Sequence, residues 1–516
     1  SMVRVDGGTT MSLSQAALTA TAPTASTVYL VDVRQLATAP LAAATAAGLD
    51  RGFMIVEGAR APSPGALATL KGVGAREIVF VNGVSGLPTA YGDALRKEGF
   101  TVRRLAGDDR VALALSAAAE YPASTTRGVI TASAQATGFG SPTATALAAT
   151  TGQPLYFGGD RCLSDSTANA IRRRGDRPLV VGPTSQLRSE VESGQGCTAV
   201  RTSRQDRLRA ALQSTLQRHS ASSFTVTVRE VGGLGEAVAL GGATRREPAS
   251  MMKLYAAWAT YKRIEAGRAS LSTRLSSGLT VGECLREMIW MSDNFCHTDL
   301  VHWIGLSHLN KEIAAAGFSR TAYGRVLRGQ DVLYAGNRTT SDDLTALLKR
   351  LEEGRLLSPT YTRHMLNLMH TQLFRSRIPN GLPASAYQAS KPGSLWVSGG
   401  LLQADSAVVR GPQGRFVITV IGAPGATKAG IRDVARTVYS HFNGSFGAAA
   451  NHSDLHVRTV RNTPWYSSSA GGRIVGTIPS GTRLQISDSR RHWYKVHWRG
   501  GYAWLYYHHV RSNLAY

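Results

Sequence analysis

Short apolar segments that alternate with alanine- and leucine-rich stretches most strongly constrain how the first 200 residues can fold. Three such segments come first, at residues 28–31, 53–56 and 77–81, and three more follow at 128–132, 154–157 and 178–181. Buried strands that alternate with helices are typical of α/β units with a parallel sheet. Two passes of similar length indicate an internal repeat. We therefore predict two α/β repeats over residues 27–203, after a flexible leader at 1–26 that is rich in Thr, Ala and Ser.

A serine and a lysine three residues apart, Ser250 and Lys253, lie at the start of a predicted helix. This spacing places both side chains on one helix face, one turn apart. A lysine that is partly desolvated there can become neutral and accept the serine proton. Residues 292–294 (Ser-Asp-Asn) and 391–393 (Lys-Pro-Gly) follow in order. The ordered set resembles the penicillin-recognising serine hydrolases, specifically their class A β-lactamase branch.

The resemblance implies a fold and a set of roles for residues 204–445. The fold is a β-lactamase-like α+β hydrolase, in which one antiparallel sheet packs on a helical domain. The implied catalytic residues are Ser250 as nucleophile, Lys253 as base, Ser292 as proton carrier to the leaving group, Asn294 as the residue that holds Lys253, and Lys391 as a cation beside Ser292. The backbone N–H groups of Ser250 and Ser394 would form the oxyanion hole, and Asp293 would turn away to bond backbone.

Two departures from the family pattern affect the expected reaction. The family places a deacylating glutamate before the Thr339–Thr340 pair, but residues 321–336 contain no Glu and only one acid, Asp331. Without that base an acyl-enzyme formed from a β-lactam would hydrolyse slowly, which favours a peptidase or transferase over an efficient lactamase. Pro392 also replaces a hydroxyl residue that helps to bind the substrate carboxylate. The substrate is therefore expected to lack such a carboxylate or to bind it weakly.

The two ends of the chain resemble wall-binding modules. Residues 78–83 and 104–110 resemble the cell-wall-binding type 2 repeat, a family associated with noncovalent anchoring to anionic wall polymers. A linker at 446–452 leads to residues 453–516, where short strands and glycine turns predict a small β-barrel. This segment resembles a bacterial SH3 domain, a module that often binds wall peptides. Trp493 and Trp504 are expected in its core.

The charge of the chain limits the kinds of partner that it is expected to bind. The net charge is +24, of which residues 1–203 carry +4, residues 204–450 carry +13 and residues 451–516 carry +7. Such a surface favours polyanions, although an arginine-rich composition with solvated charges explains it equally well. No nucleic-acid-binding, metal-ligand or cofactor motif appears, and no apolar stretch is long enough for a membrane span.

Four cysteines fall into two local pairs, Cys162 with Cys197 and Cys284 with Cys296. Two disulfides fit an exported protein, and free buried thiols remain open as the alternative.

These features together predict a secreted, wall-associated serine hydrolase that acts through an acyl-enzyme on peptide or amide bonds, with peptidoglycan stem peptides as substrates. Peptidoglycan and anionic wall polymers are the expected partners, β-lactams the expected covalent ligands, and neither a cofactor nor nucleic acid is expected. A β-lactamase is the enzymatic alternative. A non-catalytic wall-binding protein with a degenerate hydrolase fold is the alternative of another class.

Overall fold

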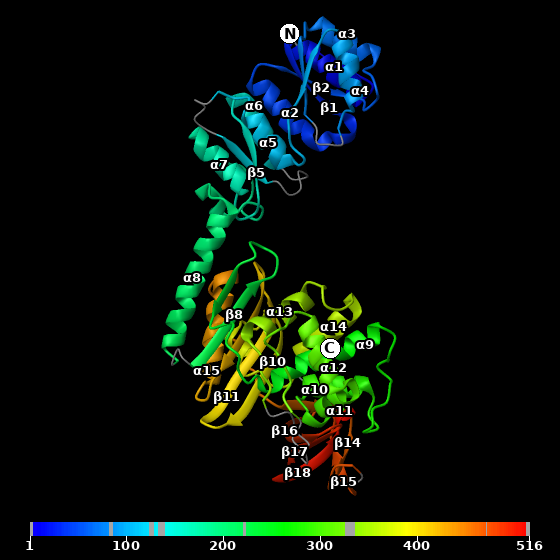
Figure 1. Cartoon of the computed structure of the whole chain (residues 1–516), viewed down its shortest axis with the longest axis vertical. Coiled ribbons are helices and arrows are strands. Elements are labelled where there is room, and N and C mark those ends of the chain that lie inside the picture. The colour runs from blue at the N-terminus through cyan, green and yellow to red at the C-terminus, as the bar shows by residue number, and fades with distance from the viewer. Residues whose placement is uncertain are drawn as a thin grey trace. The chain divides into compact units, whose positions relative to one another are not determined.

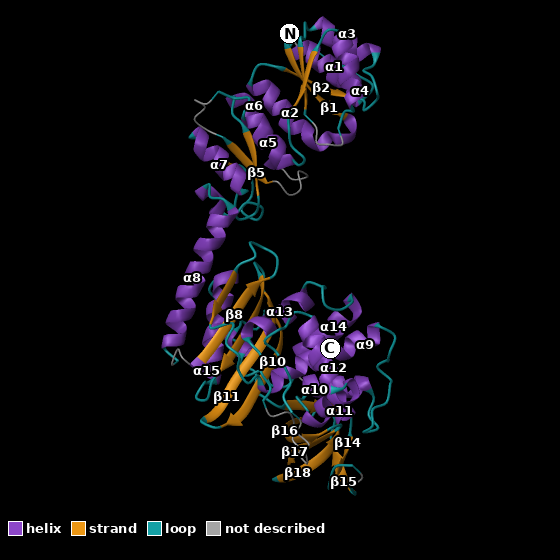
Figure 2. Ribbon diagram, viewed as in Figure 1, coloured by secondary structure: helices purple, strands orange, loops and turns teal. Residues whose placement is uncertain are grey.

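The chain falls into two compact units, residues 1–203 and 204–516. A computed structural model describes residues 4–81, 86–122, 128–132, 140–219, 223–325, 336–470 and 472–511. Figure 1 shows the chain coloured from the N-terminus to the C-terminus, and Figure 2 marks its helices and strands. Within the described residues, no helix is both long and apolar enough to cross a membrane.

The first unit contains two parallel sheets, as the alternation of apolar segments predicts. Four strands pair in the order β2-β1-β3-β4 and three in the order β6-β5-β7. Each predicted segment forms a strand, and β4 is an addition. The strands are β1 (Thr27–Asp32), β2 (Gly52–Val56), β3 (Glu77–Phe80), β4 (Thr101–Arg104), β5 (Val129–Ala132), β6 (Leu155–Gly158) and β7 (Leu179–Val180). The predicted α/β architecture of this region is therefore confirmed.

Helices pack against both sheets of this unit. They are α1 (Thr10–Thr21), α2 (Ala39–Gly48), α3 (Pro64–Gly72), α4 (Thr89–Lys97), α5 (Arg110–Ala118), α6 (Gly140–Thr151) and α7 (Asp165–Arg174), with 3₁₀ turns η1 (Val33–Thr38) and η2 (Ser189–Ser193). Helix α1 corrects the expected flexible leader. Thr9 and Ser12 cap it reciprocally, Leu18 is buried, and the Ser14 hydroxyl accepts the N–H of Ile55 at 2.8 Å. These contacts attach the segment to β2 and offset the entropy of ordering it.

The second unit is built on a five-stranded antiparallel sheet. The strands β8 (Phe224–Glu230), β9 (Ala237–Leu240), β10 (Tyr387–Val397), β11 (Gly400–Arg410) and β12 (Arg415–Gly422) pair in the order β10-β11-β12-β8-β9. Helices α8 (Cys197–Gln217) and α15 (Lys428–Asn443) contribute Leu208, Val434 and their neighbours to a core on one face. The N- and C-terminal strands of the hydrolase region, β8 and β12, are neighbours in this sheet.

The other face of the sheet packs on a helical layer (Figure 2). Its elements are η4 (Ala249–Met252), α9 (Lys253–Glu265), α10 (Val281–Trp290), α11 (Asn294–Ile304), α12 (Leu306–Ala315), α13 (Ser341–Glu352), α14 (Pro359–Thr371) and η5 (Ile378–Gly381). Helix α9 is buried along almost its whole length, including Trp258 and Tyr261. Lys253 is therefore the first residue of one of the most enclosed helices of the unit, and Ser250 lies in the turn η4 just before it.

A C-terminal module of seven short strands completes the second unit. The strands β13 (His456–Thr459), β14 (Thr463–Tyr466), β15 (Ile474–Ile478), β16 (Arg483–Arg490), β17 (Trp493–Trp498), β18 (Gly501–Tyr506) and β19 (Val510–Arg511) pair in the order β15-β14-β18-β17-β16-β13-β19, with η6 at Tyr507–His509. Tyr494, Val496 and Leu505 are buried in its core. Trp493 and Trp504 are only partly buried, contrary to expectation, because strand alternation directs them to the opposite face.

The cysteine pairs differ in state. Cys162 and Cys197 form a disulfide with a Cα–Cα distance of 4.9 Å. Cys284 and Cys296 are free buried thiols, which corrects the expectation of a second bridge. They are neighbours in the helical core, where the Cys296 side chain hydrogen-bonds Cys284 and burial raises the pKa of the Cys296 thiol. Both thiols therefore behave as small apolar core groups.

Candidate active site

The turn before helix α9 places Ser250 at the protein surface and Lys253 inside. Ala249 has a positive φ of 49°, which non-glycine residues rarely adopt and which is common at functional sites. The 3₁₀ turn η4 then carries Ser250 directly into α9, which begins at Lys253. Ser250 is partly exposed and Lys253 is fully buried.

The Lys253 amine contacts three of the predicted side chains. Its Nζ lies 2.8 Å from Ser250 Oγ, 3.3 Å from Ser292 Oγ and 2.7 Å from Asn294 Oδ1. Burial lowers its pKa to about 7, an effect that the charge of Asp293 partly opposes. A neutral amine that hydrogen-bonds a hydroxyl can accept its proton. The structure thus brings Ser250, Lys253, Ser292 and Asn294 together.

The loop between α10 and α11 presents Ser292 to this amine. Ser292 has a left-handed backbone, with a φ of 61°. Asp293 caps α11 by accepting the N–H of Cys296 at 2.8 Å. The carboxylate of Asp293 therefore points away from Lys253 and bonds backbone, as the sequence predicts, and this cap fixes the turn on which Ser292 lies.

Strand β10 brings Lys391 close to Lys253, but its amine makes no hydrogen bond to Ser292. Lys391 is fully buried, and its Nζ has no hydrogen-bond partner among the described residues. Burial and then the charge of Lys253 hold its pKa well below the ordinary value, whereas Asp405 opposes this shift. Asp405 lies opposite Pro392 on β11.

Gly393 lets β10 approach the Ser250 turn closely. A Cβ atom at this position would lie 2.7 Å from the carbonyl oxygen of Pro248 and 3.3 Å from the backbone nitrogen of Ser250. The strand therefore packs directly against η4, which brings Ser394 and Ser250 to the same cavity. These are the two residues whose N–H groups the sequence predicts as the oxyanion hole.

Arg377 is a cation of this region that the motif comparison does not single out. Its guanidinium donates to Ser394 Oγ and, at 3.0 Å from Nε, to Gln403 Oε1. The side chain is 3% exposed. Its Nη1 has no hydrogen-bond partner among the described residues. In the sequence, only its place four positions before the Gly381-Leu382-Pro383 segment hints at this role.

A cavity of about 330 Å³, here called the Ser250 cleft, opens beside these groups. Its walls come from several separate segments of the second unit. The lining residues are Ser250, Met291, Ser292, Phe374, Arg377, Pro392, Gly393, Ser394, Leu455, Ser487, Asp488 and Ser489. The last four belong to the C-terminal part of the chain and carry no motif that predicts a place beside the serine.

An acid close to the nucleophile is a second finding that motif reasoning missed. Glu247 accepts the N–H of Ala249 at 3.3 Å and a bond from Arg338 at 3.1 Å. Burial raises its pKa to about 7. It supports the strained turn before Ser250 and is not among the lining residues of the cleft. Asp331 is the one acid in residues 321–336 that could replace the missing deacylating glutamate, and it lies outside the described residues.

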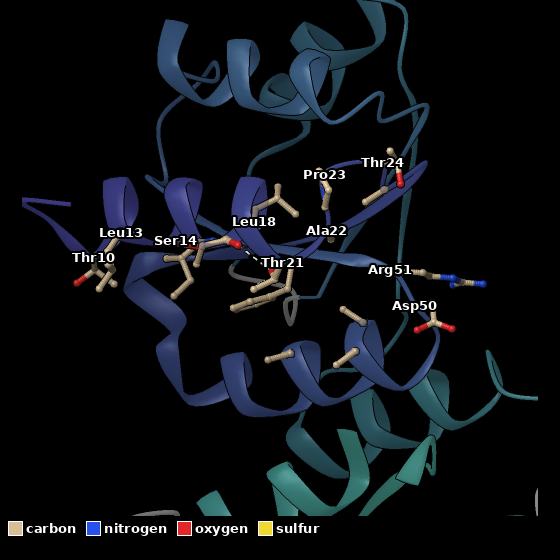
Figure 3. A pocket seen from close by; sticks show the side chains of 17 residues that line it. Thr10, Leu13, Ser14, Leu18, Thr21, Ala22, Pro23, Thr24, Asp50 and Arg51 are labelled. Carbon is tan, nitrogen blue, oxygen red and sulfur yellow. Dashed lines mark hydrogen bonds between the residues drawn. The ribbon is translucent and has the colours of Figure 1, made fainter. Parts of the chain in front are cut away.

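A larger cavity of about 770 Å³ lies in the first unit, between α1, α2 and β2. Figure 3 shows Thr10 and Leu13 at one end of it, and Asp50 and Arg51 at the other. Its described lining is otherwise mostly alanine, leucine and threonine, with no histidine, lysine or glutamate beside a hydroxyl. It lacks the groups that acid–base or nucleophilic chemistry needs. The described residues also contain no cluster of three or more acidic, histidine or cysteine side chains suited to a metal ion.

Three solved structures are similar to part of this chain. PBP-A is 24% identical over 45% of this chain and 96% of its own, with a TM-score of 0.41. An ancestral class A β-lactamase (GNCA) is 23% identical over 46% of this chain and 100% of its own, with a TM-score of 0.40. A β-lactamase from Sphaerobacter thermophilus is 23% identical over 45% and 96%, with a TM-score of 0.40. No curated protein matches the chain.

Residues 207–442 match the family model described as the beta-lactamase enzyme family. This segment contains the whole predicted set of catalytic residues and the five-stranded sheet with its helical layer. Residues 207–442 therefore have a β-lactamase-like fold.

Proposed function

We propose that the second unit is a serine acyl hydrolase that cleaves peptide or amide bonds through an acyl-enzyme, with peptidoglycan stem peptides as its substrates. One observation carries the proposal. The Lys253 amine is fully buried, has a pKa lowered to about 7 and lies 2.8 Å from Ser250 Oγ. That arrangement supplies a neutral base to a hydroxyl at the edge of an open cleft. The family match of residues 207–442 supports the same class of chemistry.

Acylation begins when Ser250 Oγ attacks the scissile carbonyl carbon and its proton passes to Lys253 Nζ. The N–H groups of Ser250 and Ser394 stabilise the oxyanion that forms. The carbon–nitrogen bond then breaks, and the leaving nitrogen takes the proton from Lys253 through Ser292. The 3.3 Å contact between Lys253 Nζ and Ser292 Oγ supports this relay. Water completes the cycle by hydrolysing the Ser250 ester.

Asn294 and Lys391 act on the base and not on the substrate in this scheme. Asn294 Oδ1 accepts a hydrogen bond from Lys253 Nζ and orients its lone pair. Lys391 is fully buried close to Lys253, and repulsion between the two amines opposes protonation of both at once. Burial, which lowers the pKa of Lys253 to about 7, favours the neutral state that proton transfer from Ser250 requires.

A β-lactamase is the second candidate, and the family match of residues 207–442 favours it. The two functions differ in deacylation. Residues 321–336 contain no glutamate, and Glu247, a partly buried acid three residues before Ser250, does not line the Ser250 cleft. A long-lived β-lactam adduct is therefore expected, which is the behaviour of a peptidase and not of a lactamase. A non-catalytic wall protein is the alternative if no adduct forms.

We also propose that the protein is secreted and held on the bacterial wall. The Cys162–Cys197 disulfide supports an oxidising compartment. The net charge of +24 supports association with anionic wall polymers. Residues 27–203 and 453–516 would provide the anchoring, which raises the local concentration of substrate. Pull-down with purified walls, with and without teichoic-acid-type polymers, tests this part alone.

Labelling with a fluorescent penicillin tests the catalytic proposal. The wild-type protein should form a covalent adduct that survives denaturation, and Ser250→Ala should abolish it. Ser394→Ala is a matched control because it removes a hydroxyl from the same cleft but leaves the nucleophile. Rapid turnover without accumulation of the adduct would instead assign a β-lactamase. Absence of any adduct with β-lactams, amides and thioesters would refute the proposal.

A further inference from the structure

The C-terminal module shares a hydrophobic core with the hydrolase helices. Trp290, Met291 and Leu373 lie in the same buried cluster as the core residues of the module. The rings of Trp290 and Tyr494 stack with centroids 6.1 Å apart. Buried apolar contacts of this kind fix two segments against each other because separation would expose them to water. The module is thus a docked part of the second unit.

Polar contacts fix the position of the module beside the serine-bearing loop. Asp293 Oδ2 accepts bonds from Ser489 Oγ at 3.0 Å and from the N–H of Arg491 at 3.1 Å. Arg491 also pairs with Asp299 at 3.1 Å. Asp293 caps α11 and directly follows Ser292. The C-terminal end of β16 is therefore tied to the same turn that presents Ser292 to Lys253.

A β-bulge turns part of β16 toward the Ser250 cleft. The pairing of β16 with β17 shifts between Ile486 and Asp488, so that Ser487 is an extra residue in the strand. Successive residues of a regular strand face opposite sides, yet Ser487, Asp488 and Ser489 all line the cleft. Bulges redirect side chains in this way and are frequent beside active sites.

The cleft consequently has one charge of each sign. Of the residues described as lining it, Arg377 and Asp488 are the charged ones. Asp488 is exposed, and its Oδ1 accepts the N–H of Ser489 at 2.8 Å, which orients the carboxylate. Arg377 is buried beside Ser394 and has an unpartnered Nη1 among the described residues. A ligand in this cleft meets a buried cation, Arg377, and an exposed anion, Asp488.

We propose that the C-terminal module forms part of the catalytic site and that Asp488 selects substrates that carry an ammonium group near the scissile bond. The inference rests on the proposed function and specifies its substrate class. The substrate is a zwitterionic peptide or amide, whose anionic group faces Arg377 and whose free amine faces Asp488. The appended module therefore contributes to substrate choice as well as to any anchoring.

A pair of acylating probes that differ by one amino group tests this inference on the full-length protein. Ampicillin carries an amine that penicillin G lacks. The second-order acylation rate constants of both probes are measured at pH 6.5 and low ionic strength. The wild type should prefer ampicillin, and Asp488→Asn should reduce the ratio of the two rate constants by about 2- to 5-fold, the size expected for one solvent-exposed charge pair. Asp488→Lys should reduce the ratio further.

A matched control removes the same charge elsewhere. Asp206→Asn changes an exposed acid on α8 outside the cleft, and it should leave the ratio unchanged. N-acetylation of ampicillin should abolish the wild-type preference. An unchanged ratio in both Asp488 variants, with acylation intact, would overturn the inference and leave the proposed function standing. Failure of both probes to acylate the wild type would overturn the proposed function and this inference with it.

Discussion

Replacement of Lys253 by methionine tests the role of the buried amine most sharply. Methionine nearly preserves the length and apolar volume of the side chain, but it removes the amine that contacts Ser250, Ser292 and Asn294. Lys253 is fully buried, so an apolar replacement leaves no unpaired buried charge. The expected result is a folded protein that acylates very slowly.

The size of the effect follows from the pKa of Lys253, which burial lowers to about 7. At pH 7.5 such an amine is neutral in roughly three quarters of the molecules, whereas an unperturbed lysine is neutral in about one in a thousand. General-base catalysis contributes about 10²- to 10⁴-fold to a rate. Lys253→Met should therefore lower the acylation rate constant by about 10³-fold.

The pH dependence of acylation shows in which direction protonation of Lys253 changes the rate. Protonation of Lys253 removes the base, so acylation should rise with pH, pass its midpoint near pH 7 and then reach a plateau. At pH 5.5 the rate should be about 30-fold below the plateau. Acylation by a fluorescent penicillin, followed from pH 5.5 to 9, measures the profile, and circular dichroism confirms folding.

Lys262→Met is the control for this experiment. Lys262 lies on the same helix but is exposed, with its amine over the ring of Trp258. It should retain the wild-type rate and the same midpoint. A flat profile in the wild type, or a Lys253→Met variant that keeps more than a tenth of the rate, would refute the assignment of Lys253 as the base.

Three further predictions follow from other parts of the structure. Asn294→Ala should lower the acylation rate constant by about 2- to 10-fold with little change in melting temperature, because it deletes one hydrogen bond of about 0.5–1.5 kcal/mol to Lys253. Equal rate constants in the variant and the wild type would contradict this. Pro392→Thr should increase acylation by a carboxylate-bearing penicillin about 5-fold but not by its methyl ester, since it adds a hydroxyl to the cleft wall; an equal gain for both would point to a backbone effect. Reduction of the Cys162–Cys197 disulfide should lower the unfolding free energy of the first unit by about 2–4 kcal/mol, which calorimetry measures. Acylation should be unchanged, because the disulfide lies in the first unit and Ser250 in the second. Loss of acylation after reduction would contradict this prediction.

The part of the site that follows local geometry is predictable from sequence. The three-residue spacing of Ser250 and Lys253 brings their side chains together, and Asp293 caps the helix that follows it. The individual strands of the first unit likewise follow from short apolar segments. These features depend on neighbours within a few residues, whereas the contact between Asn294 and Lys253, 41 residues apart, was predicted only by the family resemblance.

Contacts between distant segments account for what sequence reasoning missed. Asp488 reaches the cleft only because the C-terminal module docks on Trp290 and because β16 contains a bulge. No local pattern encodes either fact. The Thr- and Ser-rich composition of residues 9–26 suggests a flexible segment, whereas helix α1 is ordered by its capping box and by contacts with β2 such as that of Ser14 with Ile55.

The pairing of Cys284 and Cys296 could not be settled by spacing. The distance between the two cysteines along the sequence is compatible with a disulfide and also with two free thiols. The structure places these residues on adjacent helices, α10 and α11, with a side-chain hydrogen bond between the two thiols. Packing of the helices, which the sequence does not specify, decides the outcome.

Peptide mapping of the acylated protein tests the central claim most directly. The full-length protein is incubated with penicillin G, digested, and analysed by mass spectrometry for the site of the adduct. The mechanism predicts one modified residue, Ser250, and no adduct in Ser250→Ala. An adduct on Ser292 or any other residue, or an unmodified protein after prolonged exposure to penicillin and to a wall-peptide thioester, would contradict it.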